Sequence, residues 1–214
     1  MTYLKLLFDT AVEQDPRKAP KGKLPFLIIK DESGAERKLA DSDLILEYLD
    51  EISQGKLYKG LTPEEKAKGL AFSRLAEDHL YWLIVASRWL DDDWFPHVVT
   101  GFFSEVPGIL RGFVAKGARK QVATTLNLHG LGRHTLEEQK AFARRDLQAI
   151  ADAVVHNHHI VGGRLTVYDF VIAAMLSGLL DNEPATWMSK IGNGYPSLRQ
   201  YLERIQKEVG VSGK

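Results

Sequence analysis

The spacing of apolar residues changes near residue 60, and this change restricts the possible folds of the 214-residue chain more than any other feature. Before it, short apolar runs alternate with turn residues. Residues 24–29 are therefore predicted to form a buried strand that pairs with residues 36–39 across a turn. Beyond it, apolar residues recur at helical spacing. The sequence predicts a mostly α protein: a small α/β part of about 55 residues followed by an all-helical part of about 150.

Three capping boxes mark helix starts in the second part of the chain, at Thr62, Thr135 and Thr166. In such a box, the threonine and an acidic residue three positions later satisfy each other's backbone N–H groups. Ser42 is a further candidate N-cap. The expected helices span residues 43–49, 63–90, 120–126, 136–155, 167–180 and 198–208. The helix over residues 167–180 is almost wholly apolar, so we expect it to be the buried centre of the second part.

Residues 101–119 contain four residues that disfavour helix: Pro107, Gly108, Gly112 and Gly117. Proline removes a backbone donor, and glycine in a helix costs about 1 kcal/mol relative to alanine. We therefore expect a broken or bent helical segment here rather than one continuous helix.

Composition excludes several classes of function. Lys and Arg total 28, as do Asp and Glu, so the net charge is zero and provides no general attraction to nucleic acid or anionic lipid. The absence of cysteine excludes a thiolate nucleophile, a redox dithiol and a Cys-ligated metal. No apolar run reaches the roughly 18 residues that span a bilayer, and the histidines of residues 156–159 suit a helix end better than a metal. We predict no metal, no nucleic-acid partner, no membrane span and a cytoplasmic location.

Two short segments resemble one known family. The first is Lys-Gly-Lys-Leu-Pro-Phe-Leu at residues 21–27, followed by Ala-Asp-Ser at residues 40–42. The second is Leu-Thr-Val-Tyr-Asp at residues 165–169. They resemble the glutathione transferase superfamily, in which a thioredoxin-like N-terminal domain is joined to an all-helical C-terminal domain. Residues 77–82, 87–89 and 130–134 resemble more specifically the branch that contains the failed-axon-connections and metaxin-related proteins.

The resemblance implies a glutathione site in the N-terminal domain. Pro25 would be the cis-proline of the thioredoxin-like fold, which leaves the Leu24 backbone free to pair with the backbone of glutathione. Asp41 and Ser42, at a helix start, would hold the γ-glutamyl end, and Lys23 would reach the glycyl carboxylate. Structural alternatives stay open: Pro25 as a trans proline at a strand edge, Ser42 as a cap only, and Lys23 as a solvated lysine.

The same resemblance implies that the helix over residues 63–90 walls a pocket for a small hydrophobic electrophile. The candidate lining residues are Tyr81, Trp82, Arg88 and Trp89. Aromatic rings beside a guanidinium suit an apolar molecule that bears an anionic group. The alternative is that the two tryptophans are core residues and that Glu77, Asp78 and Arg88 form buried ion pairs between helices.

The start of the chain departs from the family pattern. A strand–helix–strand unit needs roughly 30 residues, and only 24 precede Pro25. We expect a shortened domain, in which either residues 2–8 end the first helix and residues 9–14 form the second strand, or residues 3–8 form the first strand. The loop that would carry the sulfur-activating Tyr, Ser or Cys is not recognisable. Tyr3 is the remaining catalytic candidate, and a truncated N-terminus stays open.

The resemblance implies a shortened thioredoxin-like domain at residues 1–55 and an all-helical domain at residues 62–210. The predicted activity is transfer of the glutathione thiolate to a small apolar electrophile, with glutathione as co-substrate. The implied assembly is a homodimer in which the N-terminal domain of one subunit packs against the helical domain of the other. The alternative is a non-catalytic glutathione transferase-like module that binds a ligand or partner. The sequence specifies neither the electrophile nor the physiological role.

Overall fold

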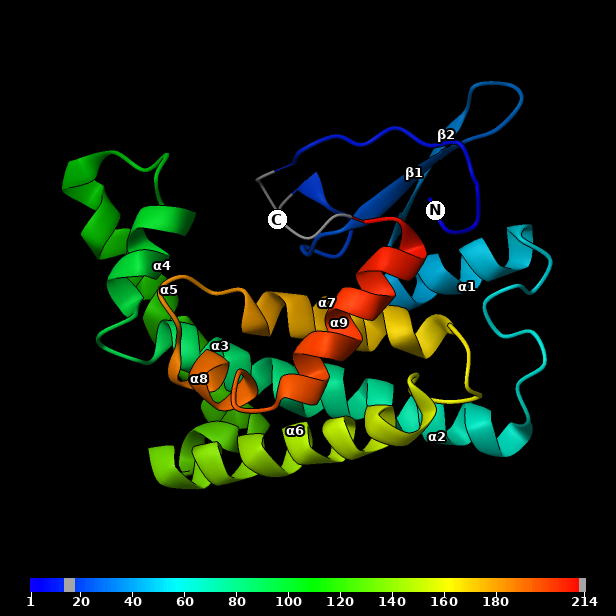
Figure 1. Cartoon of the computed structure of the whole chain (residues 1–214). Helices are drawn as coiled ribbons and strands as arrows, with labels where there is room; N and C mark the ends of the chain where they lie inside the picture. The colour runs from blue at the N-terminus through cyan, green and yellow to red at the C-terminus, as the bar shows by residue number, and fades with distance from the viewer. Residues whose placement is uncertain (14–17, 212–214) are drawn as a thin grey trace.

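The structure is a computed structural model of the chain and describes residues 1–13 and 18–211. Helices make up most of it, and a small antiparallel sheet lies to one side (Figure 1). The strands and the helix after them are β1 (Phe26–Lys30), β2 (Glu36–Ala40) and α1 (Ser42–Ile52). The other α-helices of the described residues are α2 (Pro63–Arg74), α3 (Tyr81–Trp89), α4 (Phe95–Phe102), α5 (Gly108–His129), α6 (Leu136–Asn157), α7 (Val167–Leu180), α8 (Trp187–Gly192) and α9 (Pro196–Val209). The predicted order, an α/β part followed by helices, is confirmed.

β1 and β2 form the predicted hairpin, with Phe26 opposite Ala40. The prediction that the first strand is buried is wrong, because no residue of β1 is buried and Ile28 is exposed. Asp31 closes the turn between them, because its Oδ1 accepts hydrogen bonds from the backbone N–H groups of Ser33 and Ala35 at 2.8 and 3.0 Å. In the part of the chain that the structure describes, the sheet consists of these two strands.

Neither arrangement predicted for the start of the chain is correct. Residues 2–5 form a turn, and no helix or strand follows through residue 13. Residue 14, the last of the predicted second strand, lies outside the described residues. Leu4 is buried, and the ring of Tyr3 meets the ring of Phe170 in α7 edge-on at 5.7 Å. The segment is therefore held by side-chain packing against the helices rather than by strand pairing.

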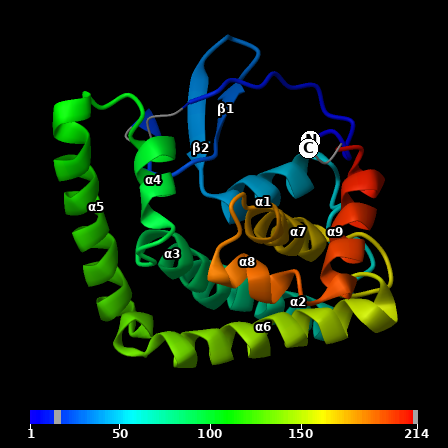
Figure 2. The ribbon, with the colours of Figure 1, turned by 60° about the vertical axis from the view of Figure 1, so that its left-hand side comes forward.

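α7 is the buried centre of the helical part and packs against α2, α8 and α9 (Figure 2). Its capping box is formed as predicted: Asp169 Oδ2 accepts hydrogen bonds from the Thr166 backbone N–H at 2.8 Å and the Thr166 hydroxyl at 2.9 Å. Asp169 Oδ1 accepts two more at 2.9 Å, from the Ile160 N–H and the Tyr201 hydroxyl. The fully buried carboxylate thus receives four hydrogen bonds in place of water and ties α7 to α9.

The predicted helix over residues 63–90 is continuous but not uniform. It begins at a capping box between Thr62 and Glu65, as expected. α2 and α3 are joined by a π-helical segment, Leu75–Leu80. Such segments are rare, bulge out of an α-helix and occur frequently at functional sites. The π-helical segment therefore makes this helix a candidate position for a functional site.

The break predicted over residues 101–119 is correct at Pro107 and wrong after it. Pro107 precedes α5, which runs without interruption through Gly112 and Gly117 for 22 residues. The separate helix predicted over residues 120–126 is part of α5. Two internal glycines cost only about 2 kcal/mol relative to alanine, which the packing of a long helix can offset. The short helices α4 and α8 are additional to the prediction.

Candidate functional site

Two adjoining depressions lie between the N-terminal part and helices α2, α3 and α7. The polar pocket, of about 440 Å³, lies beside Pro25 and the start of α1. The apolar cavity, of about 680 Å³, lies between α1, α3 and α7. Five residues line both: Pro25, Ser42, Glu77, Tyr81 and Met175. Molecules bound in the two depressions would therefore lie next to each other, beside the five residues that line both.

The structure brings all the residues predicted to bind glutathione to the polar pocket. They are Lys23, Leu24, Pro25, Asp41 and Ser42. The Leu24–Pro25 peptide bond is cis, as the resemblance implied. Within residues 1–13 and 18–211, no hydrogen bond occupies the Leu24 backbone N–H or C=O. Both groups therefore remain available to an extended peptide ligand.

Asp41, rather than Ser42, is the N-cap of α1, so the predicted cap is wrong by one residue. Asp41 Oδ1 accepts a hydrogen bond from the Asp43 N–H at 3.1 Å, with Asp41 at an unusual φ of 91°. α1 begins at Ser42, one residue earlier than predicted, so its N-cap is Asp41. The Ser42 hydroxyl has no hydrogen-bond partner among the described residues and lines both depressions. The start of α1 thus presents a free hydroxyl and the positive end of a helix dipole.

Of the residues predicted to line a pocket for an electrophile, Tyr81, Arg88 and Trp89 line the apolar cavity. Trp82 is not among the lining residues. The centroid of its ring lies 5.2 Å from that of Tyr81 and 5.2 Å from that of His129. Trp82 is therefore a packing residue between α3 and the end of α5.

α7 supplies a wall of the cavity that sequence analysis missed. Its contributions are Phe170, Val171, Ala174, Met175 and Gly178. These positions follow helical spacing and share one face of α7. Because nearly all of α7 is apolar, no contrast in the sequence separates this face from the faces that lie in the core.

Tyr3, the remaining candidate for activating sulfur, does not line either depression. Tyr3 is 38% exposed, and its ring packs against that of Phe170, a residue that lines the apolar cavity. The structure therefore places Tyr3 against a residue of the cavity wall rather than at the polar pocket.

Arg88 is held by the C-terminal end of α7 rather than by a carboxylate. Its Nη2 donates hydrogen bonds to the Gly178 carbonyl and, at 2.8 Å, to Asn182 Oδ1. No ion pair involves Arg88 among the described residues, so the alternative that it forms a buried ion pair between helices is wrong for this residue. Burial lowers the pKa of Arg88 below its ordinary value. The cavity wall thus carries a guanidinium without a carboxylate counter-ion.

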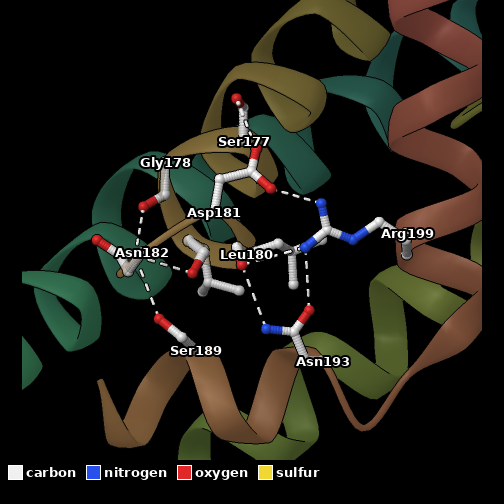
Figure 3. Close-up of polar contacts among 9 residues, drawn as sticks. Ser177, Gly178, Leu180, Asp181, Asn182, Ser189, Asn193 and Arg199 are labelled. Carbon is white, nitrogen blue, oxygen red and sulfur yellow. Dashed lines mark hydrogen bonds and ion pairs between the residues drawn. The ribbon is translucent and has the colours of Figure 1, made fainter. Parts of the chain in front are cut away.

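Figure 3 shows the polar network that fixes this end of α7. Asn182 Nδ2 donates hydrogen bonds to the Gly178 carbonyl at 2.8 Å and to Ser189 Oγ at 3.2 Å. Arg199 of α9 forms an ion pair with Asp181, the residue directly before Asn182. Contacts from both α8 and α9 therefore stabilise the end of α7 that carries the two hydrogen-bond acceptors of Arg88.

Glu77 is a carboxyl group at the wall that the two depressions share. Its Oε2 accepts a hydrogen bond from Arg74 Nη1 at 2.7 Å, while Arg74 Nη2 bonds Asp43 Oδ2, also at 2.7 Å. Burial raises the pKa of Glu77 to about 7. The neighbouring carboxylates of Asp43, Asp78 and Asp41 add to this rise, and Arg74 opposes it. Glu77 therefore exchanges protons near neutral pH.

A strand hairpin and helix beside an all-helical part, with a polar pocket at the proline before β1 and an apolar cavity next to it, define the glutathione transferase-like class of fold. Comparison with known families agrees. Residues 1–94 match the family described as "Glutathione S-transferase N-terminal domain", and residues 136–212 match "Glutathione S-transferase, C-terminal domain". The chain belongs to the glutathione S-transferase family.

Two relatives confirm the predicted resemblance, including its branch. The isoprene-epoxide–glutathione S-transferase of Rhodococcus sp. (strain AD45) is 34% identical over 203 residues, which cover 90% of this chain and 80% of the relative. Failed axon connections of Drosophila melanogaster is 27% identical over 178 residues, which cover 76% of this chain and 40% of the relative. No solved structure matches significantly.

Proposed function

We propose that this protein joins the thiolate of glutathione to a small apolar electrophile. Glutathione binds in the polar pocket, and the electrophile binds in the apolar cavity against Tyr81, Arg88 and Trp89. The observation that supports this most directly is the shared wall, which places the contents of the two depressions side by side. Such proximity is itself a large source of catalysis, because it removes the entropic cost of bringing two reactants together.

The polar pocket matches the charge pattern of glutathione. The Ser42 hydroxyl and the start of α1 suit the γ-glutamyl carboxylate, and Asp41 suits its ammonium. The free backbone of Leu24 suits the peptide portion. Lys23, whose Nζ lies 5.8 Å from the Tyr81 ring centroid, suits the glycyl carboxylate.

A small epoxide is the electrophile class we propose. The Rhodococcus relative carries such a substrate in its name. The cavity wall offers aromatic and aliphatic contact for a hydrocarbon, and its polar groups include Arg88 and Glu77, which suit an oxygen atom.

The test is to measure glutathione binding by calorimetry and conjugation of a small alkene epoxide by product analysis. We expect Ser42→Ala to weaken glutathione binding about fivefold, since it removes one hydrogen bond to a charged group. Ser33→Ala in the exposed hairpin turn is the matched control and should bind like the unmodified protein. Absence of glutathione binding at millimolar concentration would refute the proposal. Binding without turnover of any electrophile would favour the non-catalytic module instead.

We also propose that the protein forms a homodimer through α5. This helix exposes apolar side chains to an unusual degree, with Ile109 98% and Phe113 82% exposed one helical turn apart. Contiguous exposed apolar side chains of this kind mark interaction surfaces. A second copy of the chain is the partner that the family resemblance implies.

A cytoplasmic location stays a prediction, since a chain without cysteine has no requirement for an oxidising compartment. Among the described residues, no helix has both the length and the apolar character needed to cross a membrane. The same residues contain no group of three or more side chains placed to hold a metal ion.

A further inference from the structure

Glu77 occupies a place that no other carboxyl group of the described residues shares: it lines both the polar pocket and the apolar cavity. Its side chain is 21% exposed. One carboxyl oxygen, Oε2, is bonded to Arg74, and the other, Oε1, has no hydrogen-bond partner within the described ranges. Glu77 would therefore lie beside both a thiol in the polar pocket and an electrophile in the apolar cavity.

The residues around Glu77 raise the pKa of its carboxyl group. Arg74 is shared between Glu77 and Asp43, so one guanidinium balances two carboxylates. Glu77 lies in the π-helical segment Leu75–Leu80, a kind of segment that occurs frequently at functional sites. The charged and titratable side chains that line the two depressions together with Glu77 are Lys21, Lys23, Asp41, Asp43, Arg74, Asp78, Tyr81 and Arg88. Burial, with the carboxylates of Asp43, Asp78 and Asp41, outweighs the effect of Arg74 and raises the pKa of Glu77 to about 7, near the value that suits general acid–base catalysis.

We propose that Glu77 is a catalytic residue that carries the thiol proton of glutathione to the oxygen of an epoxide. Its carboxylate removes the S–H proton, and the sulfur electron pair forms the C–S bond. As the C–O bond of the epoxide ring breaks, its electron pair moves to oxygen, which takes the proton from the Glu77 carboxyl group. The product is a β-hydroxy thioether, and the carboxylate is regenerated without any other reagent. This inference rests on the proposed transferase function.

The shuttle predicts a particular dependence on pH. The active state holds one proton between Glu77 and the thiol. Below about pH 7 both groups are protonated and no base is present, whereas above the thiol pKa of about 8.5 both have lost their protons and no acid is present. The kcat/KM for an epoxide should therefore be bell-shaped. An aryl halide releases halide, which needs no proton, so its kcat/KM should rise with pH and stay high.

The experiment compares the unmodified protein with Glu77→Gln, using a small alkene epoxide and an aryl halide between pH 6 and 9.5. We expect Glu77→Gln to lower kcat/KM for the epoxide about 100-fold and to replace the bell with a single rise. With the aryl halide at pH 9.5, where the thiol ionises unaided, the variant should approach the unmodified protein. Glu77→Asp should restore part of the epoxide activity and the bell. Glu51→Gln, an exposed carboxyl-to-amide change on α1, is the matched control.

Calorimetry with glutathione separates the possible failures. If Glu77→Gln binds glutathione and keeps both the epoxide rate and the bell, the shuttle is refuted while the transferase proposal stands. If it loses aryl halide turnover at pH 9.5, where the thiol ionises unaided, as strongly as it loses epoxide turnover at pH 8, the loss does not depend on proton transfer by Glu77, which also refutes the shuttle. If the unmodified protein binds glutathione but turns over neither electrophile, both proposals are overturned.

Discussion

The N-terminal region (residues 1–61) and the helical region (residues 62–211) bury their side chains to different extents. α7, at the centre of the helical region, is buried along most of its length, including the carboxylate of Asp169. In the hairpin, Ile28 is 46% exposed, and Leu49 is the buried residue of α1. The helical region therefore contains most of the hydrophobic core, and the N-terminal region depends on packing against it.

The candidate glutathione-binding residues are distributed in the opposite way. The candidate glutathione residues all come from residues 23–42 of the N-terminal region, while the apolar cavity is walled mainly by α3 and α7. Most of the hydrophobic core and the candidate glutathione-binding residues therefore belong to different parts of the molecule. Substitutions in the core of one region should change unfolding, and substitutions in the other should change affinity.

The largest effect is expected from Asp169→Ala in the helical region. It removes the acceptor of four hydrogen bonds and leaves buried donors unpaired, so the free energy of unfolding should fall by about 3 kcal/mol. Urea titration measures this loss. The affinity of the folded fraction for glutathione should not change, because Asp169 lines neither depression.

Asp152→Ala, on the exposed side of α6, is the control and should stay within about 0.5 kcal/mol of the unmodified protein. A loss below about 1 kcal/mol for Asp169→Ala would show that the buried network contributes little. A change in glutathione affinity at full folding would break the division of roles between the two regions.

Local signals explain why the helical region was the easier one to predict. A capping box joins residues only three positions apart, so Thr62, Thr135 and Thr166 identified three helix starts without knowledge of the tertiary fold. The predicted N-cap of α1 is wrong by one residue. Asp41 and Ser42 are both residue types that cap helices well, and tertiary context decides between them.

Packing between distant segments explains the failures. The turn at residues 2–5 is fixed by contacts of Leu4 and Tyr3 with the helical region, which no local pattern reveals. The α7 wall of the cavity and the acceptors of Arg88 are likewise contributed from far along the chain. Glu77 was named only as a partner in ion pairs, because its position between two depressions depends on how both regions dock.

A smaller effect is expected from Phe113→Asp, which tests whether the exposed face of α5 contacts a second copy. A charge placed on a buried interface should weaken the dimer by about 2 kcal/mol, or roughly 30-fold in dissociation constant. Light scattering over a concentration series measures this shift. Val155→Asp, at an exposed apolar position on α6, is the control and should leave the dimer intact. A monomer at every concentration of the unmodified protein would contradict the dimer.

The smallest effect on stability is expected at Asp41, where a structural role and the proposed binding role meet in one residue. Asp41→Ala removes the cap of α1 and should lower the free energy of unfolding by about 1 kcal/mol. Asp41→Asn keeps an oxygen acceptor for the Asp43 N–H, and asparagine, like aspartate, is among the non-glycine residues that most often adopt positive φ. The lost attraction to Lys21, at 3.9 Å in an exposed pair, is worth little. Denaturant titration should therefore show Asp41→Asn nearly as stable as the unmodified protein.

Glutathione affinity separates the two roles of Asp41. If its carboxylate balances the γ-glutamyl ammonium, both variants should bind glutathione about fivefold more weakly, because both remove the negative charge. Asp41→Asn would then lose affinity without losing stability, which is the behaviour assigned to the N-terminal region. If Asp41→Asn binds as well as the unmodified protein while Asp41→Ala binds weakly, the residue acts only by holding the start of α1. The ammonium would then need another partner, and Asp78, a further carboxyl group in the polar pocket, is the one to replace next.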